Sequence, residues 1–206
     1  MGRWEPDSRG RLAQAALELF AERGFENTTV AEIAERAGLT ERTFFRHYAD
    51  KREVLFPTGG EFENLIVTAI ESAPAALAPI DAVGLGLDAA AAMLEQRGEF
   101  SRRRQAIITA NAELRERELI KLASLSDAIA DTLRGRGVTD PGASLTAEVA
   151  IAVFRVAFAR WHDEAGGEDL RQIMRSSLDE LKAQMGAPSS APAGQAGEPA
   201  NAVTQV

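Results

Sequence analysis

The sequence predicts an all-α protein with about nine helices. Apolar residues recur three and four positions apart through most of the chain, as they do on the buried face of a helix. No segment shows the two-residue alternation of a half-buried strand, and clusters of glycine and proline separate the periodic segments. We expect a three-helix domain over residues 1–53, a larger helical domain over 54–185, and a disordered tail over 186–206, where Ala, Pro, Ser and Gly dominate.

The first helix is expected to run from Asp7 or Ser8 to Arg23. Gly24 can adopt the left-handed conformation that ends many helices. Phe25 would then fill the small core between the first three helices. The inward stripe of this helix consists of Leu12, Ala16, Leu19 and Phe20.

Two short helices joined by a tight turn are predicted between residues 28 and 51. Thr29 and Glu32 have the spacing of a capping box, in which each side chain bonds to the other residue's backbone N–H. Gly38 can end the first of these helices, and Thr40 is a suitable N-cap for the second. This helix–turn–helix pattern is the basis for the functional hypotheses below.

The second of these short helices has two different faces. Phe44 and Tyr48 are four residues apart and should pack inward, whereas Arg42 and Arg46 share another face. A short helix that exposes arginine, threonine and imidazole suits the major groove of DNA. A solvated helix in an ordinary helical domain is an equal alternative on these residues alone.

The remainder of the chain predicts helices separated by glycine and proline. Residues 51–55 should begin a fourth helix, which Pro57 and the two following glycines interrupt, so residues 57–60 form either a hinge or a plain loop. Pro74 and Pro79 bracket a linker, and Gly84 and Gly86 should weaken the start of the next helix. The further helices are expected over residues 61–72, 81–96, 100–111, 113–135, 144–166 and 168–185.

Composition argues against several kinds of protein. The 206 residues include no cysteine and only two histidines, which are far apart, so we expect no disulfide, no metal and no cofactor. We found no phosphate-binding glycine loop and no nucleophile motif, so we expect no catalytic residues and no enzyme activity. The charged N-terminus is unlike a signal peptide, and no run approaches the ~18 apolar residues of a membrane span, which predicts a soluble, cytoplasmic protein.

The segment AALELFAERGFENTTVAEIAERAGLTERTFFRHYADKREVL resembles the DNA-binding half of the TetR family of transcriptional regulators. The resemblance covers roughly a quarter of the chain, from Leu12 to about Leu55, and rests on the combination of G-F, T-T-V, A-G-L-T and F-x-H-Y-x-x-K-x-x-L. It implies a helix-turn-helix domain followed by a helical domain that binds a small effector and dimerises. It also implies a palindromic operator as the DNA partner.

The predicted DNA contacts combine residue chemistry with this resemblance. Arg42 and Thr43 are the candidates for base edges, and Arg46 for a base or a phosphate. The resemblance implies that Thr28, Thr29, His47 and Lys51 contact the DNA backbone. Phe45 stands where the family commonly has tyrosine, so a hydroxyl contact is lost while ring packing remains. The full set of predicted DNA-binding residues is Thr28, Thr29, Thr40, Arg42, Thr43, Phe45, Arg46, His47 and Lys51.

Charge is unevenly distributed along the chain. Residues 1–55 contain nine Lys or Arg and ten Asp or Glu, so most of the net charge of −8 lies in the second domain. Long-range steering toward DNA should therefore be weak, although a local basic face can still bind phosphate. Three arginines near the N-terminus predict either a basic arm that reaches toward DNA or a solvated leader: Arg3, Arg9 and Arg11.

The effector site is predicted from aromatic and apolar residues of the second domain. The segments RRRQAIITANAELRERELIKL and RVAFARWHDE also resemble a TetR subgroup with an acyl-CoA-like ligand domain. This resemblance implies an anionic head group near Arg102, Arg103 and Arg104. A solvated basic face and a plain core are the alternatives. The predicted ligand-binding residues are Phe62, Leu65, Ile66, Leu87, Met93, Phe100, Arg103, Ile107, Phe154, Phe158 and Trp161.

These features together predict a homodimeric repressor that a small hydrophobic or acyl-CoA-like effector releases from DNA. One recognition helix reads too few base pairs to select a genomic site, so a second copy is needed. The helices at 144–166 and 168–185 are the candidates for the dimer interface, with Ile173 and Leu181 on the apolar stripe of the second. The alternative is a helical dimerisation or binding protein without specific DNA recognition.

Overall fold

A computed structural model of the chain describes residues 7–56, 60–163 and 169–186. Over these residues it contains nine α-helices, one 3-10 helix and no strand, which confirms the all-α prediction. The elements are α1 (Ser8–Arg23), α2 (Val30–Arg36), α3 (Glu41–His47), η1 (Glu53–Leu55), α4 (Glu61–Glu71), α5 (Pro79–Glu95), α6 (Gly98–Ala110), α7 (Ala112–Gly135), α8 (Gly142–Asp163) and α9 (Leu170–Gly186).

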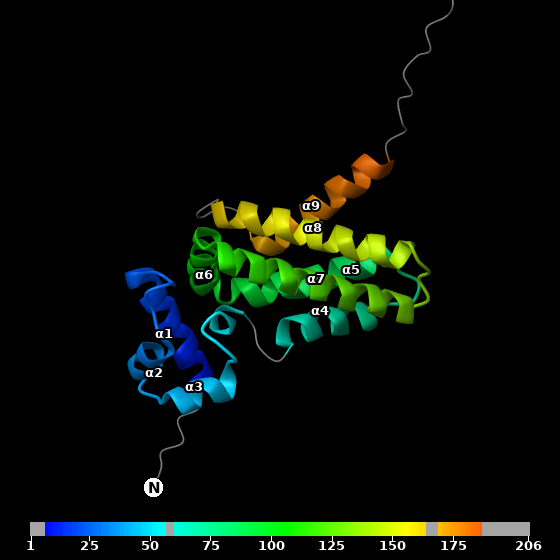
Figure 1. Ribbon diagram of the computed structural model, residues 1–206. Helices are drawn as coiled ribbons and strands as arrows, with labels where there is room; N and C mark the ends of the chain where they lie inside the picture. The colour runs from blue at the N-terminus through cyan, green and yellow to red at the C-terminus, as the bar shows by residue number, and fades with distance from the viewer. Residues whose placement is uncertain (1–6, 57–59, 164–168, 187–206) are drawn as a thin grey trace, which may run out of the picture.

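The helices form two groups that follow one another along the chain. Helices α1 to α3 make a small unit at one end of the molecule, and α4 to α9 make an elongated bundle beside it (Figure 1). The core of the small unit contains Phe20, Phe25, Phe44 and Tyr48, and Ile108 and Leu114 of the bundle also belong to it. The small unit therefore shares its core with α6 and α7.

The capping box and the end of α1 at Gly24 are present as predicted, and Asp7 adds an N-cap that was not predicted. The Asp7 carboxylate accepts from the Gly10 N–H at 2.8 Å at the start of α1, and Gly24 ends this helix with φ 82°. Thr29 and Glu32 form both bonds of the capping box. Because these bonds join neighbours in sequence, the pattern alone sufficed to place them.

Residues 51–55 do not begin an α-helix, contrary to prediction. The Asp50 carboxylate accepts from the N–H groups of Arg52 at 2.8 Å and Glu53 at 3.2 Å, which makes a turn that leads into η1. Val54 is buried after this turn, so the segment is anchored in the core of the small unit. The fourth α-helix starts only after Gly60, which has φ 71°.

Two predictions fall largely outside the described residues. Of the proposed hinge at 57–60, only Gly60 is described. The proposed tail at 186–206 is described only at its first residue, and Arg3 of the proposed arm is not described. Arg9 lies within α1 and pairs with Glu61 of α4 at 3.0 Å, so it belongs to the folded part of the chain and not to an extended arm.

The glycines of α5 lie within the helix and allow its close packing against α4 and α9. A Cβ atom on Gly86 would lie 3.0 Å from side-chain carbons of Ile66 and Ile70 on α4, and one on Gly84 would lie 3.1 Å from Leu178 on α9. The helix also begins at Pro79, two residues before the prediction, because proline is well suited to the first helical turn. Pro79 is thus part of α5 and not of a linker.

Helix α8 is buried on more than one side, as its apolar sequence predicts. It packs against α5, α7 and α9, and Ala147, Ala150 and Phe158 lie in the bundle core. By length and composition α8 is apolar enough to cross a membrane, which the sequence analysis did not anticipate. Its Glu148 accepts a hydrogen bond from Ser126 of α7 at 2.7 Å. The buried side of α8 packs into the bundle core, while Leu145 and Val156 on another side are exposed.

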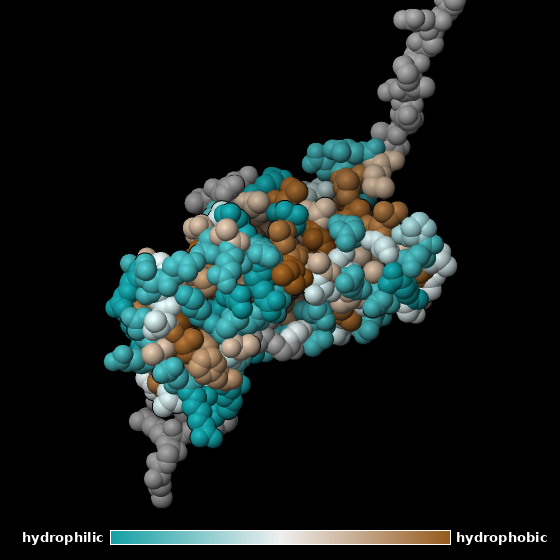
Figure 2. Space-filling model, viewed as in Figure 1, coloured by the Kyte–Doolittle hydropathy of each residue, from teal (hydrophilic) through white to brown (hydrophobic). Residues whose placement is uncertain are grey.

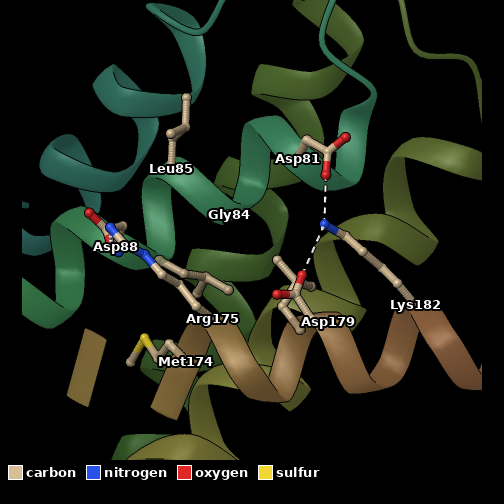
Figure 3. A pocket seen from close by; sticks show the side chains of 10 residues that line it. Asp81, Gly84, Leu85, Asp88, Met174, Arg175, Asp179 and Lys182 are labelled. Atoms are coloured by element: carbon tan, nitrogen blue, oxygen red, sulfur yellow. Dashed lines mark hydrogen bonds and ion pairs between the residues drawn. The ribbon is translucent and has the colours of Figure 1, made fainter. Parts of the chain in front are cut away.

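The apolar stripe of α9 packs inside the bundle. Ile173 is fully buried there together with Met174 and Leu178, so contrary to prediction it is not available to a second chain, whereas Leu181 is only partly buried. Ion pairs hold α9 against α5 across a cleft of about 280 Å³, where Lys182 reaches Asp81 at 2.6 Å (Figure 3). The charged groups that line this cleft are engaged with one another.

Candidate nucleic-acid interface

The recognition helix α3 is held by its buried face. The Phe44 side chain is completely buried, and its ring lies 5.4 Å from the ring of buried Tyr48. The Tyr48 hydroxyl donates to the Arg9 carbonyl at 3.1 Å, and burial raises the Tyr48 pKa, so this hydroxyl stays protonated. These contacts fix the rotation of α3 about its axis.

The opposite face of α3 is free to meet a partner. Phe45 is 55% exposed, and Arg42 and Arg46 are also exposed, with Thr43 partly so. Within the described part of the chain Arg42 forms no ion pair. Two arginines beside an exposed aromatic ring can contact phosphates, base edges and sugars without first breaking an internal ion pair.

The turn between α2 and α3 positions this face. Gly38 has φ 65°, and the Leu39 N–H donates to the Ala34 carbonyl at 2.8 Å, which closes the end of α2. The Thr40 hydroxyl then accepts from the Thr43 N–H at 3.2 Å and starts α3. Thr40 and Thr43 also bond to each other through their hydroxyls at 3.1 Å, so these two predicted DNA-binding threonines also have a structural role at the start of α3.

His47 lies at the end of α3, between the recognition face and the first helix. The Ser8 hydroxyl lies 2.9 Å from its Nε2 atom, and the Arg46 guanidinium lies at 3.5 Å. Partial burial lowers the His47 pKa, and the positive charges of Arg46 and Arg9 lower it further. The imidazole is therefore neutral at pH 7 and can offer a hydrogen bond to a phosphate, but no charge.

Two residues predicted to contact phosphate have internal roles instead. Thr28 is 1% exposed, and its hydroxyl donates to the Gly24 carbonyl at 2.9 Å, so it lies away from the surface. The Lys51 ammonium donates to the carbonyls of Phe25 at 2.9 Å and Thr28 at 3.2 Å, and to a third carbonyl nearby. It also lies 4.3 Å above the Phe25 ring. Lys51 thus joins the turn before α2 to the segment after α3.

Thr29 lies at the surface with its hydroxyl already bonded. It donates to the Glu32 carboxylate at 2.8 Å and accepts from the Glu32 N–H at 3.3 Å. Of the nine predicted DNA-binding residues, only Thr28 is buried, and the other eight are exposed or partly exposed: Thr29, Thr40, Arg42, Thr43, Phe45, Arg46, His47 and Lys51.

The contacts between this unit and the bundle are ionic as well as apolar. Glu53 of η1 is buried, and its carboxylate receives Arg117 at 2.5 Å and Lys121 at 3.1 Å, both from α7. Arg104 of α6 donates to the Leu55 carbonyl and lies 5.0 Å above the Phe56 ring. The sequence analysis did not identify Glu53, since nothing in its local pattern distinguishes a buried carboxylate from an exposed one.

Arg104 is unsuited to hold an anionic head group. Its side chain is largely buried, and burial lowers its pKa while Glu118 at 3.7 Å favours the charged form. Arg103 is exposed and pairs with Glu99 at 2.8 Å, and Arg102 lies 4.6 Å above the Trp161 ring. The three consecutive arginines thus have three different environments.

The predicted ligand-binding residues fall into two separate groups. Phe62, Phe154, Phe158 and Trp161 form a continuous aromatic row, with neighbouring ring centroids 5.7 to 5.8 Å apart, and Ile66 and Leu87 belong to the same core. Phe100 and Ile107 instead pack against the core of the small unit. Leu65 is exposed, and Met93 is partly buried. One pocket lined by the whole set is therefore not formed.

This fold and this surface define a helix-turn-helix DNA-binding protein with an attached helical domain. Residues 12–56 match the family described as bacterial regulatory proteins, tetR family, and residues 77–186 match the MftR C-terminal domain. The second match alone covers more than half of the chain. The chain belongs to the TetR family of transcriptional regulators, which is a family of regulators and not of enzymes.

Curated relatives are similar over the N-terminal part. The HTH-type transcriptional regulator TcmR of Streptomyces glaucescens is 41% identical over 76 residues, which is 37% of this chain and 34% of TcmR. The HTH-type transcriptional repressor KstR2 of Mycobacterium tuberculosis is 43% identical over 47 residues, or 23% of this chain and 24% of KstR2. The chain thus spans about a third or less of the length of these curated relatives.

A solved structure is similar over nearly the whole chain. It is the Thermus thermophilus FadR, described as a TetR-family transcriptional repressor in complex with lauroyl-CoA. The sequence identity is 25%, the TM-score is 0.58, and the match covers 90% of this chain and 100% of that chain. The two-domain helical architecture is therefore shared.

Proposed function

We propose that this chain is a cytoplasmic repressor that binds a palindromic operator as a homodimer and is released by a small hydrophobic or acyl-CoA-like effector. The observation that carries the proposal is the exposed face of α3. Phe44 and Tyr48 fix the helix, and Arg42 and Arg46 point away from the protein beside exposed Phe45. Arginine in the major groove pairs in bidentate fashion with guanine, the commonest specific contact with DNA.

An exposed apolar stripe on α8 supports the dimer. Leu145 is 62% exposed and Val156 is 58% exposed, with Ala152 and Ala159 exposed between and beyond them. Their spacing puts them on one side of the helix. Figure 2 shows apolar surface gathered over the middle of α7 and α8. A second copy related by two-fold symmetry would cover the same stripe on both chains and set the spacing of two recognition helices.

The aromatic row supports an apolar effector in the bundle. The Phe154 and Phe158 rings are stacked within 7° of parallel, and Trp161 continues the row toward Arg102. The similar FadR structure holds lauroyl-CoA, which combines an alkyl chain with an anionic head. Glu53 and Arg104 connect α6 and α7 to the small unit, so a ligand that shifts these helices would also shift α3.

The test starts from DNA selection. Fragments of the source genome are mixed with the protein and excess competitor DNA, and retained fragments are sequenced. Arg42→Ala should then weaken binding to the selected operator by ~1–3 kcal/mol and relax preference at one base pair of each half-site. The control Arg97→Ala changes an exposed arginine outside the interface and should leave affinity unchanged.

Fluorescence anisotropy on operator and shuffled duplexes gives the measurement. If Arg42→Ala weakens both duplexes equally, Arg42 contacts phosphate and not a base. If the protein retains no fragment above competitor DNA, the repressor proposal fails and the helical binding protein becomes the better explanation.

A further inference from the structure

A second cleft lies between the small unit and α6. It has a volume of about 570 Å³, within the range of small-molecule sites. One wall comes from the end of α1 and the turn after it, and the other comes from α6. Arg103 and Ile107, which sequence analysis assigned to the effector pocket of the bundle, line this cleft instead.

The floor of the cleft is apolar and held in place. Phe20 and Phe25 lie edge to face, with ring centroids 5.2 Å apart, and the Lys51 ammonium fixes the other side of the Phe25 ring at 4.3 Å. Across from them, Ala106 and Ala110 of α6 are exposed. The hollow lies between the small side chains on α6 and the end of α1, where Phe20 and Phe25 are almost fully buried and contribute a small part of the surface.

The polar groups of the cleft differ at its two ends. At one end the Asn111 side-chain amide donates to Glu26 at 3.3 Å, and its side-chain oxygen caps α7. The polar groups of Asn111 are therefore already engaged in hydrogen bonds within the protein. At the other end, and within the described residues, the one ion pair of Arg103 is with Glu99, one helical turn away, and both side chains are more than half exposed. Such an exposed pair contributes little stability, so Arg103 can turn to another anion.

We propose that this cleft is a binding site for a small amphipathic anion, with its apolar body between Phe25 and Ala106 and its anionic group on Arg103. The site is separate from the aromatic row of the bundle. Because its two walls belong to the DNA-binding unit and to α6, binding depends on how these parts are arranged. Affinity for the anion and affinity for the operator are then linked, and each must change the other by the same factor.

The probe for the test is 8-anilinonaphthalene-1-sulfonate, which has aromatic rings, one sulfonate and fluorescence that rises in apolar surroundings. Titration of the full chain should show a class of sites that Ala106→Phe weakens at least about tenfold by filling the hollow. Arg103→Gln should weaken the probe several-fold by removing its cationic partner. This second variant changes an exposed side chain and keeps the fold.

Two matched substitutions control for non-specific effects. Ala76→Phe adds the same ring to an exposed loop, and Arg97→Gln removes the same charge from an exposed position near α6. Both should bind the probe as the unchanged protein does. If Ala106→Phe and Arg103→Gln also bind it unchanged, the probe lies elsewhere and the site is overturned.

The link to DNA is tested by repeating the titration with saturating operator. A shift of the probe dissociation constant, lost in Ala106→Phe, supports the coupling, and an unchanged constant overturns it. Only this step rests on the repressor proposal. Operator binding of each variant without the probe is measured separately, so failure of the DNA proposal is distinguished from failure of the cleft.

Discussion

Lys51 shows how a single cation can hold a DNA-binding unit together. Its ammonium donates hydrogen bonds to the carbonyls of Phe25, Glu26 and Thr28, which belong to the turn that precedes α2. The resemblance to the family implied a phosphate contact for this lysine, whereas in this structure its three donors are directed inward. Any effect of Lys51 on DNA binding would therefore act through the position of α2.

We predict that Lys51→Met lowers the free energy of unfolding by about 1.5–3 kcal/mol, the usual contribution of hydrogen bonds to a charged group. Urea denaturation followed by circular dichroism gives the value. Arg97→Met is the control, since Arg97 is exposed and should tolerate the change. Unchanged stability combined with weaker binding to every DNA sequence would instead restore the phosphate role.

At the scale of helices, close approach explains the glycines of α5. A Cβ on Gly86 would also lie 3.2 Å from the Ile66 backbone carbonyl, which cannot rotate away as a side chain can. We predict that Gly86→Ala destabilises the protein by about 1–3 kcal/mol because overpacking outweighs the gain in helix propensity of about 1 kcal/mol.

Gly135, at the end of α7, provides the matched comparison. A Cβ there would meet nothing within 4 Å, so Gly135→Ala should stabilise the protein by up to about 1 kcal/mol through helix propensity alone. Thermal unfolding of both variants measures the difference. Equal effects of the two substitutions would show that α4 and α5 do not approach as closely as the structure indicates.

At the scale of the whole molecule, Glu53 connects the two parts. Its buried carboxylate receives Arg117 and Lys121, so Glu53→Gln leaves two cations of α7 without their partner. We predict a loss of about 1.5–3 kcal/mol in stability. If the proposed effector acts through α7, the response of DNA binding to effector should also weaken, because Glu53 connects α7 to the small unit. Glu116→Gln, an exposed carboxylate on α7, is the control and should change neither quantity.

Dimer formation gives the fifth prediction. Val156→Asp with Leu145→Asp should produce a folded monomer that has lost operator binding, since both side chains are exposed in the single chain. Ile173→Asp should instead unfold the protein, because it buries a charge in the core. Sedimentation and circular dichroism separate these outcomes. A dimer that persists with both α8 substitutions would place the interface elsewhere.

Local features of this protein were predictable from its sequence. The capping box at Thr29, the cap at Thr40, the turn at Gly38 and the inward face of Phe44 all depend on residues within one or two helical turns. For the same reason the helix count was correct and most helix ends were close to those observed. The motif that runs through these positions also indicated the TetR family before any tertiary information was used.

Other properties depended on which helices meet in space. Periodicity shows that α9 has an apolar face, but it cannot tell whether that face meets α5 and α8 of the same chain or a second chain; the structure buries Ile173 within the chain. It likewise cannot tell that Lys51 meets the Phe25 carbonyl or that Arg103 and Ile107 face the small unit. Hydrophobic burial and ion pairing can join side chains at any separation along the chain, so the sequence alone does not say which partner a side chain meets. The packing of the helices decides it.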